Sequence, residues 1–377
     1  MRIALAGLLA LAVAMGIGRF AFTPLMPMMQ AEGAITLVEG GWLASANYAG
    51  YLVGALTAVT LGLRPVAMVR LALVAVALST LAMAWEAGIF AAMALRCVAG
   101  VASAWVLVST SAWCLHRFER APAGQRPRLA ATLYAGVGVG ILAAGLACLA
   151  LLRAGGDART GWLVLGGAAA VATVALGFLM GDDASAPSTS AAPGMRWDAT
   201  AWRLVIAYGL FGFGYIIPAT YLPAMARAAF TDPLVYGWTW PVFGAAAAAS
   251  VFVAAAARRR FSERGTWIAG HVLMAIGVAL PIVASGIGGI VCAGVLVGGT
   301  FMVVTMAGMQ EARRVRGAAA RPLMAAMTSA FAAGQIAGPL LVSALAARGA
   351  SYAPTLAIAA VGLLAACPLL PRTEPAP

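Results

Sequence analysis

The sequence predicts an all-α membrane protein with twelve transmembrane helices in two pseudo-symmetric six-helix bundles. Three observations support this: an apolar composition, twelve long apolar segments, and a repeat at one fixed offset. Of the 377 residues, 63% are hydrophobic and only 10% are charged, whereas soluble proteins carry about 25% charged residues. A water-soluble core cannot bury so much apolar surface, so we expect the lipid bilayer to be the solvent of this chain.

The predicted spans are each close to the length of about 20 residues that crosses a bilayer. They cover residues 3–29, 41–63, 66–86, 88–115, 129–152, 160–180, 200–228, 237–257, 265–285, 287–310, 322–346 and 351–370. Residues 181–199 are rich in Ala, Ser, Pro and Gly, which is typical of a flexible linker. We therefore predict an N-terminal bundle over residues 1–180, a cytoplasmic linker over 181–199 and a C-terminal bundle over 200–377.

The repeat begins in the first span, where AMGIGRFAFTPLMPMM (residues 14–29) interrupts an apolar run with two glycines and two prolines. Four of these residues recur 196 positions later, and Trp42 recurs as Trp238 at the same offset. The recurring residues are Gly212, Gly214, Pro223 and Met225, which follow Gly16, Gly18, Pro27 and Met29. Interrupted apolar segments at matching places in two halves indicate the binding site of a transporter.

The arginines predict the orientation. The net charge is +12, which in a soluble protein would indicate nucleic acid binding. Here the arginines lie in short loops, so we expect no nucleic-acid partner. With the N-terminus inside, 18 arginines fall in the inner segments, and the outer segments hold Arg153, Arg159, Arg227 and Arg348. This excess predicts a multi-pass protein of the bacterial cytoplasmic (inner) membrane with both termini in the cytoplasm. We expect it to be a monomer.

The sequence gives little support to an enzyme, a metal site or a sensor. The five cysteines lie in apolar runs without a CxxC pair, and His116 and His271 are far apart, so we expect no metal and no cofactor. The spans contain no paired acids and no nucleophile next to a base. The chain also has no P-loop and no soluble output domain.

Two arginines, Arg19 and Arg96, lie inside spans without an acid at their depth. Because a charge there costs roughly 2.5 kcal/mol or more, something must compensate for it. One candidate is an anionic substrate, since paired guanidinium groups suit a carboxylate, sulfonate or phosphate. The other is the backbone, because Pro24 and Pro27 deprive two carbonyls of their helical donors. Those carbonyls belong to Phe20 and Thr23, and both compensations stay open at this point.

The remaining site candidates follow from polar residues within spans and from the repeat. The offset relates Arg19 to Tyr215 and Asn47 to Phe243, so the first half contributes charge and the second contributes aromatic surface. This asymmetry suits an amphipathic anion, although single aromatic residues also pack helices and anchor them at the interface. The predicted substrate-binding residues are Arg19, Asn47, Tyr51, Arg96, Tyr215, Tyr221, Trp240, Phe243 and Gln335.

Proton coupling needs a carrier, and no acid lies in mid-span. Glu39 and Glu86 lie nearest, at outer span ends. Either one of them takes the proton or the carboxylate of the substrate enters protonated. We favour Glu39, with Arg96 as a coupling partner that pairs with it when the site is empty. The alternative is that Glu39 only caps its helix, because acids are favourable at helix N-termini.

At this point the chain resembles the major facilitator superfamily. LRCVAGVA (residues 95–102) resembles its fourth-span motif R-x-x-x-G-x-[GA], whose arginine is linked to proton coupling, and this implies such a role for Arg96. GIGRFAFTPLMPMM, GWLASANYAGYLVGAL and FAAGQIAGPLL resemble the YbfB/YjiJ-like branch. Two motifs depart from the family pattern: TLGLRPVAMVR lacks the Asp of the loop motif, and GVGVGILAAG lacks the Pro of the antiporter motif.

The resemblance implies the major facilitator fold and transport by alternating access. We therefore expect a secondary active transporter of a small organic, anionic solute, with proton coupling by symport or antiport as an option. The alternative is a broad-specificity drug or metabolite exporter that works by proton antiport. A third hypothesis, from a different class of protein, is a membrane-embedded sensor or enzyme, and the sequence disfavours it.

Overall fold

The structure is a computed structural model that describes residues 1–61, 63–85, 88–181, 197–230, 232–257, 262–284, 286–317 and 320–371. All of its regular elements in these ranges are helices. In chain order they are α1 (Arg2–Leu11), η1 (Ala12–Arg19), α2 (Phe22–Ala31), α3 (Leu37–Thr60), α4 (Pro65–Ala82), α5 (Gly88–Phe118), η2 (Ala123–Gln125), α6 (Arg126–Arg153), α7 (Ala158–Leu179), α8 (Ala199–Ala229), α9 (Pro233–Tyr236), α10 (Thr239–Ala257), α11 (Glu263–Val283), α12 (Ile287–Arg316), α13 (Ala320–Ala346), α14 (Ala353–Ala366) and η4 (Cys367–Leu369).

The helices fall at the places of the twelve predicted spans. Within the described residues, ten helices are long and apolar enough to cross a membrane. The other two predicted spans correspond to α3, which has 24 residues, and to the shorter apolar stretch Ala353–Leu369. The predicted fold class, an all-α membrane protein, is confirmed. The predicted first span is one stretch in three parts, since α1, the π-helix η1 and α2 follow one another.

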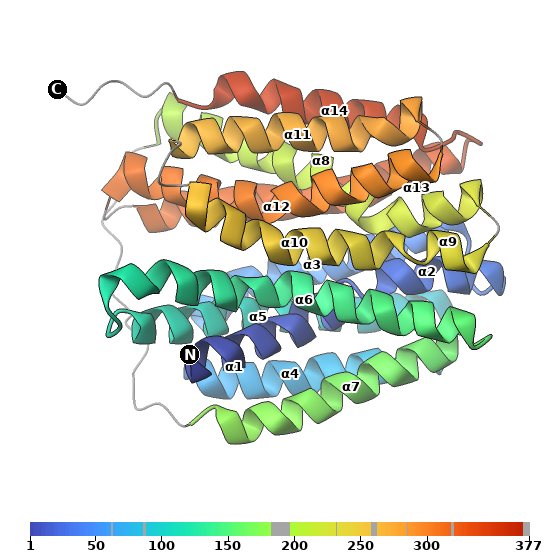
Figure 1. Cartoon of the computed structure of the whole chain (residues 1–377), viewed down its shortest axis with the longest axis horizontal. Coiled ribbons are helices and arrows are strands. Elements are labelled where there is room, and N and C mark those ends of the chain that lie inside the picture. Colours follow the sequence, from blue (N-terminus) through green and yellow to red (C-terminus); the bar gives the residue numbers. More distant parts are fainter. Residues whose placement is uncertain are drawn as a thin grey trace.

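The helices lie side by side along one direction, and the first and last described residues lie at the same end of the bundle (Figure 1). Helices α1–α7 pack mainly with one another, as do α8–α14, and the two groups contact each other through α3 with α13, α6 with α10, and α2 with α8. We call the end that holds the chain termini the terminal end, and the opposite end the distal end. Helices α2 and α13 finish at the distal end, and α3 begins there.

Glycines allow helices to approach closely at the contact between α6 and α10. A Cβ atom on Gly138 would lie 2.2 Å from the backbone nitrogen of Ala248, and one on Gly244 would lie 2.3 Å from that of Leu142. No side chain fits at such distances, so backbone packs directly against backbone. Small residues serve this purpose in membrane helices because lipid provides no hydrophobic force to hold helices together.

Two predictions about the organisation of the chain stay predictions. Most of the predicted linker, residues 182–196, lies outside the described residues. The packing of the two groups agrees with a division into bundles of residues 1–180 and 200–377. The division and the repeat both stay predictions.

Candidate substrate site between the two helix groups

The site begins with the irregular first span, where proline changes the hydrogen bonding of the backbone. The N–H of Phe20 donates to Met15 five residues earlier, at 3.0 Å, as in a π-helix. Pro24 has no N–H to offer to Phe20, and the N–H of Thr23 donates to the Phe20 carbonyl instead, at 3.1 Å. The carbonyl of Arg19, which lies four residues before Thr23, is thereby left without its helical donor.

Arg96 on α5 supplies the missing donors. Its Nη2 donates to the carbonyl of Arg19 at 2.8 Å, and its Nη1 donates to the carbonyl of Gly18 at 3.2 Å. Asn47 on α3 adds to this clamp, because its Nδ2 donates to the carbonyl of Arg96 at 2.8 Å and lies 3.3 Å from that of Gly18. A guanidinium group has several donors in a fixed plane, so one side chain satisfies two neighbouring carbonyls.

These contacts correct two expectations. The freed carbonyls that Arg96 binds belong to Gly18 and Arg19, not to Phe20 and Thr23, because the hydrogen bond from Thr23 shifts the gap toward the start of the span. Arg96 and Asn47 were also predicted to bind the substrate directly. Instead their hydrogen bonds run within α1–α7, since the irregular first span provides the compensation that a buried charge requires.

Arg19, in contrast, points across the interface between the two groups. Its side chain is only 2% exposed. Its Nη2 donates to Oε1 of Gln335 on α13 at 2.5 Å. The guanidinium carbon lies 4.0 Å from the centre of the Tyr51 ring and 5.2 Å from that of Tyr48, both close enough for a cation–π interaction. Its Nε has no hydrogen-bond partner.

The polar contacts of Arg19 continue into the C-terminal group. Nε2 of Gln335 donates to the hydroxyl of Tyr215 on α8 at 2.5 Å. The ring of Tyr215 lies between those of Phe301 and Phe331, with centroid distances of 5.6 and 5.5 Å and interplanar angles of 6° and 11°. Arg19, Gln335 and Tyr215 therefore form one buried chain of polar groups that joins the two groups of helices.

Sequence reasoning missed Phe301 and Phe331. A signal was present for Phe331, because it lies four residues before Gln335 and therefore on the same face of a helix. Phe301 had no such signal.

Trp240 and Phe243 extend the aromatic surface back toward the first span. Phe243 lies 5.9 Å from Phe301 and 4.8 Å from Trp240, measured between ring centroids. Trp240 in turn lies 6.0 Å from Phe20, the residue next to Arg19. The predicted aromatic residues of α10 thus lie in one row that begins and ends near the Arg19–Gln335–Tyr215 chain.

Tyr221 lies apart from this cluster. Its ring is fully buried and is 5.8 Å from that of Tyr352, and its hydroxyl has no hydrogen-bond partner. The structure thus brings most of the predicted site residues together, namely Arg19, Tyr51, Tyr215, Trp240, Phe243 and Gln335. Asn47 and Arg96 instead hold the backbone of the span that carries Arg19.

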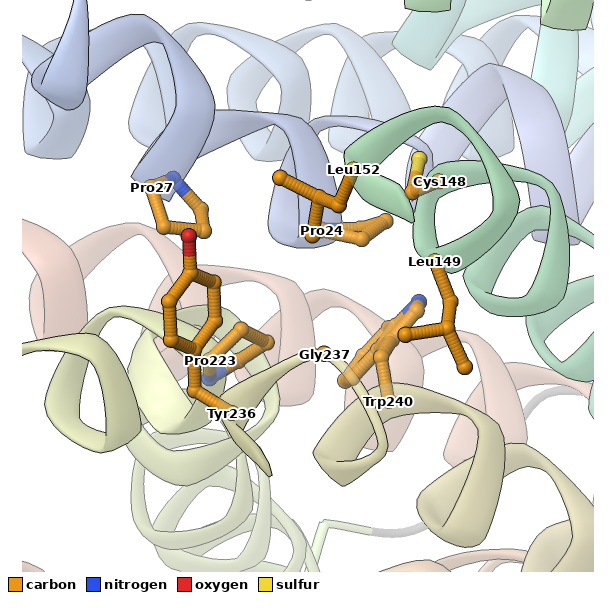
Figure 2. Close-up of a pocket in the computed structure, with 9 residues that line it drawn as sticks. All are labelled: Pro24, Pro27, Cys148, Leu149, Leu152, Pro223, Tyr236, Gly237 and Trp240. Atoms are coloured by element: carbon orange, nitrogen blue, oxygen red, sulfur yellow. The ribbon is translucent and has the colours of Figure 1, made fainter. Parts of the chain in front are cut away.

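A narrow crevice lies between the two groups on the distal side of this cluster. Its volume is about 10 Å³, room for about one water molecule. Figure 2 shows Pro27 and Pro223 facing this space, with the Tyr236 hydroxyl directed toward Pro27. Pro27 and Pro223 are 196 positions apart, so the crevice lies where the two repeat copies meet.

Further hydrogen bonds join the groups near the distal end. Thr23 Oγ1 donates to the carbonyl of Ala219 at 3.2 Å, and the hydroxyl groups of Tyr48 and Thr220 lie 2.9 Å apart. Two serines donate across the α3–α13 contact: Ser45 to the carbonyl of Ile336 at 3.2 Å and Ser343 to that of Val38 at 3.0 Å. In this structure the interface between the two groups of helices is therefore closed on its distal side.

The predicted pair of Glu39 and Arg96 is not formed in this structure. Glu39 Oε2 accepts hydrogen bonds from the Thr36 N–H and hydroxyl, both at 2.8 Å, and the Glu39 N–H donates to the Thr36 hydroxyl. This is a capping box at the start of α3, and the guanidinium of Arg96 is occupied by carbonyls. The geometry favours the alternative that Glu39 caps its helix. Glu86, the other acid considered, lies outside the described residues.

This arrangement defines a class of protein: a multi-pass membrane transporter, with two groups of helices closed over a buried polar and aromatic site. Residues 11–370 match the family described as "uncharacterised MFS-type transporter YbfB", and the chain belongs to that family of the major facilitator superfamily. The match confirms the resemblance seen in the sequence motifs. Its members are transporters and are generally not enzymes. No curated protein sequence matches the chain.

Proposed function

We propose that this protein is a secondary active transporter that moves a small, amphipathic organic anion across the cytoplasmic membrane by alternating access. The observation that carries the proposal is the environment of Arg19. Its guanidinium is buried between the two groups, and the hydrogen bond that it donates across the interface goes to the neutral amide of Gln335. A buried cation is costly without a countercharge, and a bound anion would provide that charge.

The surroundings of Arg19 support the class of substrate. A carboxylate, sulfonate or phosphate binds a guanidinium group through two parallel hydrogen bonds. The Nε of Arg19 has no partner and is available to such an anion, and its Nη2 donates to Gln335 until the anion replaces that acceptor. The rings of Tyr51 and Tyr48 present apolar surface next to this cation. The rings of Tyr215, Phe243 and Trp240 continue the aromatic surface beyond it. An anion with an apolar or aromatic body therefore fits the site better than a small inorganic anion.

The same contacts suggest how binding is linked to movement. Gln335 holds Arg19 from the opposite group of helices, and an incoming anion would compete with its amide oxygen. The loss of that bond weakens the distal contacts between the groups. From the excess of arginines at the terminal end, we propose that this end is cytoplasmic, so that the structure represents a state closed toward the outside.

Two proton carriers were considered, Glu39 and the carboxylate of the substrate itself. The geometry supports the second, in which the substrate enters protonated. Glu39 is engaged in its capping box, and Arg96 is engaged with backbone carbonyls. We propose a monomer as the transporting unit, because residues of one chain complete the site.

Transport into proteoliposomes tests the proposal. The purified protein would be supplied with a panel of organic anions, each with and without an imposed pH gradient. We expect saturable uptake of an amphipathic anion that is stimulated by an acidic exterior. Arg19→Gln should reduce binding at least about tenfold, because a hydrogen bond to a charged group contributes 1.5–3 kcal/mol. Arg128→Gln, at the exposed terminal end, is the control. Uptake that is equal in Arg19→Gln and wild type would overturn the proposal.

A further inference from the structure

A second cavity lies within the N-terminal group, at its distal end. Its volume is about 440 Å³, which is within the range of small-molecule sites. It lies between the end of α2, the start of α3, the connection from α4 to α5, and the start of α7. We call this cavity the distal vestibule. It is lined by Met29, Glu32, Ala34, Ile35, Glu39, Leu43, Met83, Ala84, Trp85, Gly88, Ile89, Ala92, Leu95, Asp157, Ala158, Arg159 and Trp162.

The charges around the distal vestibule have both signs. Glu32, Glu39 and Asp157 line it together with Arg159. All three acids cap helices with one oxygen: Glu32 Oε1 accepts from the Ala158 N–H and Asp157 Oδ1 from the Thr160 N–H, both at 2.8 Å, and Glu39 Oε2 accepts from Thr36. The other oxygens of Glu32 and Glu39 have no partner among the hydrogen bonds of the described residues and are free to accept from a cation. The vestibule therefore offers anionic acceptors and one cationic donor.

Arg159 is the donor that an occupant of the distal vestibule can reach. Its side chain lines the cavity and is exposed. Trp162 also lines the cavity, but its side chain is only 1% exposed, so its indole N–H is enclosed by protein. Arg159 therefore indicates that the occupant carries an acceptor, in addition to the cationic group that the carboxylates indicate.

The position of the distal vestibule indicates where this occupant comes from. The helices that border it begin or end there, and their apolar lengths place these ends at the boundary between hydrocarbon and headgroups. Trp85 lines the cavity and is 58% exposed, as is typical of interfacial tryptophans. The remaining wall is apolar, with Met29, Ile89 and Leu95 among its residues.

We propose that the distal vestibule binds the headgroup of a phospholipid with a primary ammonium group, such as phosphatidylethanolamine. The ammonium group donates hydrogen bonds to Glu32 and Glu39, and the phosphate accepts from Arg159. The first part of an acyl chain lies against the apolar wall. The cavity thus matches a zwitterion attached to an apolar body, and this lipid site is separate from the substrate site at Arg19.

Native mass spectrometry of the purified full chain tests this proposal. The protein is titrated with phosphatidylethanolamine and, separately, with phosphatidylcholine of the same acyl chains. Choline keeps the positive charge but has no N–H to donate. We expect phosphatidylethanolamine to bind about tenfold more tightly, since hydrogen bonds to charged groups contribute 1.5–3 kcal/mol. Equal affinities for the two lipids would overturn the proposal.

Three variants place the binding in the distal vestibule. Glu32→Gln and Glu39→Gln should each reduce the preference for phosphatidylethanolamine several-fold, and glutamine at position 39 keeps the capping box. Arg159→Gln should weaken both lipids equally, because both carry the phosphate. The matched controls are Glu119→Gln and Arg128→Gln, both at the exposed terminal end. If the controls reduce binding as much as the three variants, the lipid binds elsewhere and the proposal fails.

Discussion

The hydroxyl of Thr23 donates a hydrogen bond to the carbonyl of Ala219 at 3.2 Å, and these two residues are 196 positions apart in the chain. The same offset relates Pro27 to Pro223, which line one crevice. The irregular first span and its repeat copy in α8 therefore meet at equivalent positions. This is the arrangement expected where the axis relating two repeat copies passes between them.

The Thr23–Ala219 contact should favour the state that is closed at the distal end. Thr23→Val keeps the shape of the side chain and removes the hydrogen bond, which contributes about 1 kcal/mol. We expect roughly a fivefold shift of the population toward distal opening. The measurement is the distance between spin labels on cysteines at Ala34 and Arg348. Thr132→Val is the control, because the Thr132 hydroxyl bonds within its own helix. An unchanged distance distribution for Thr23→Val would contradict this prediction.

Arg96 should be a positioning residue. Arg96→Ala leaves the carbonyls of Gly18 and Arg19 without donors and should lower the free energy of unfolding by about 3 kcal/mol, the sum of two hydrogen bonds to a charged group. Arg96→Lys should recover part of this loss. Denaturant titration in detergent measures both. A variant Arg96→Ala with unchanged stability and no substrate binding would instead place Arg96 in contact with the substrate, as its charge within a span predicts.

Gln335→Glu should convert the Arg19 contact into an ion pair. The new carboxylate competes with the anion for the guanidinium group, so we expect anion binding to fall at least about tenfold at neutral pH. Binding of a sulfonate, which stays ionised at acidic pH, should recover there, because protonation of the new Glu removes that competition. Tryptophan fluorescence during titration measures the affinity, and Gln125→Glu in an exposed turn is the control. If Gln335→Glu binds the anion as wild type does, Gln335 does not hold Arg19 in the resting state.

The ion pair between Asp198 and Arg316 should make stability depend on acid. The hydrogen bond from Arg316, together with that from the Ala201 N–H, lowers the pKa of Asp198 to about 2 from its usual 3.8. The stabilisation is complete above pH 3.8 and is lost as the pH falls through about 2. Asp198→Asn keeps a helix cap and removes the charge. The difference in unfolding midpoint between this variant and wild type should therefore shrink between pH 4 and pH 2, and a constant difference would contradict the assignment.

The span positions could be predicted from the sequence because apolar length alone determines them. The predicted span 287–310 begins where α12 begins, for example, and 322–346 ends where α13 ends. The gap in the backbone hydrogen bonds after the π-helix η1 could not be predicted, because it depends on which donor takes the Phe20 carbonyl once Pro24 cannot. The role of Arg96 followed from that detail, since a buried guanidinium group binds whichever acceptors lie in reach.

The candidate site was predicted in part, for a similar reason. Arg19, Tyr215 and Gln335 were identified separately, by charge, by repeat position and by polarity within a span. Their joining into one chain across the interface depends on how η1, α8 and α13 come together. Phe301 was missed because an isolated aromatic residue in an apolar span carries no signal of its own.

The most direct test of the central claim compares an anionic ligand with its neutral amide analogue. Once the panel of anions has provided a ligand, its carboxylate and amide forms are titrated against wild type, Arg19→Gln and the control Arg128→Gln. If the Arg19 guanidinium binds the anion, wild type and the control should prefer the carboxylate at least about tenfold, and Arg19→Gln should bind both forms equally. A preference for the carboxylate that survives in Arg19→Gln would contradict the account.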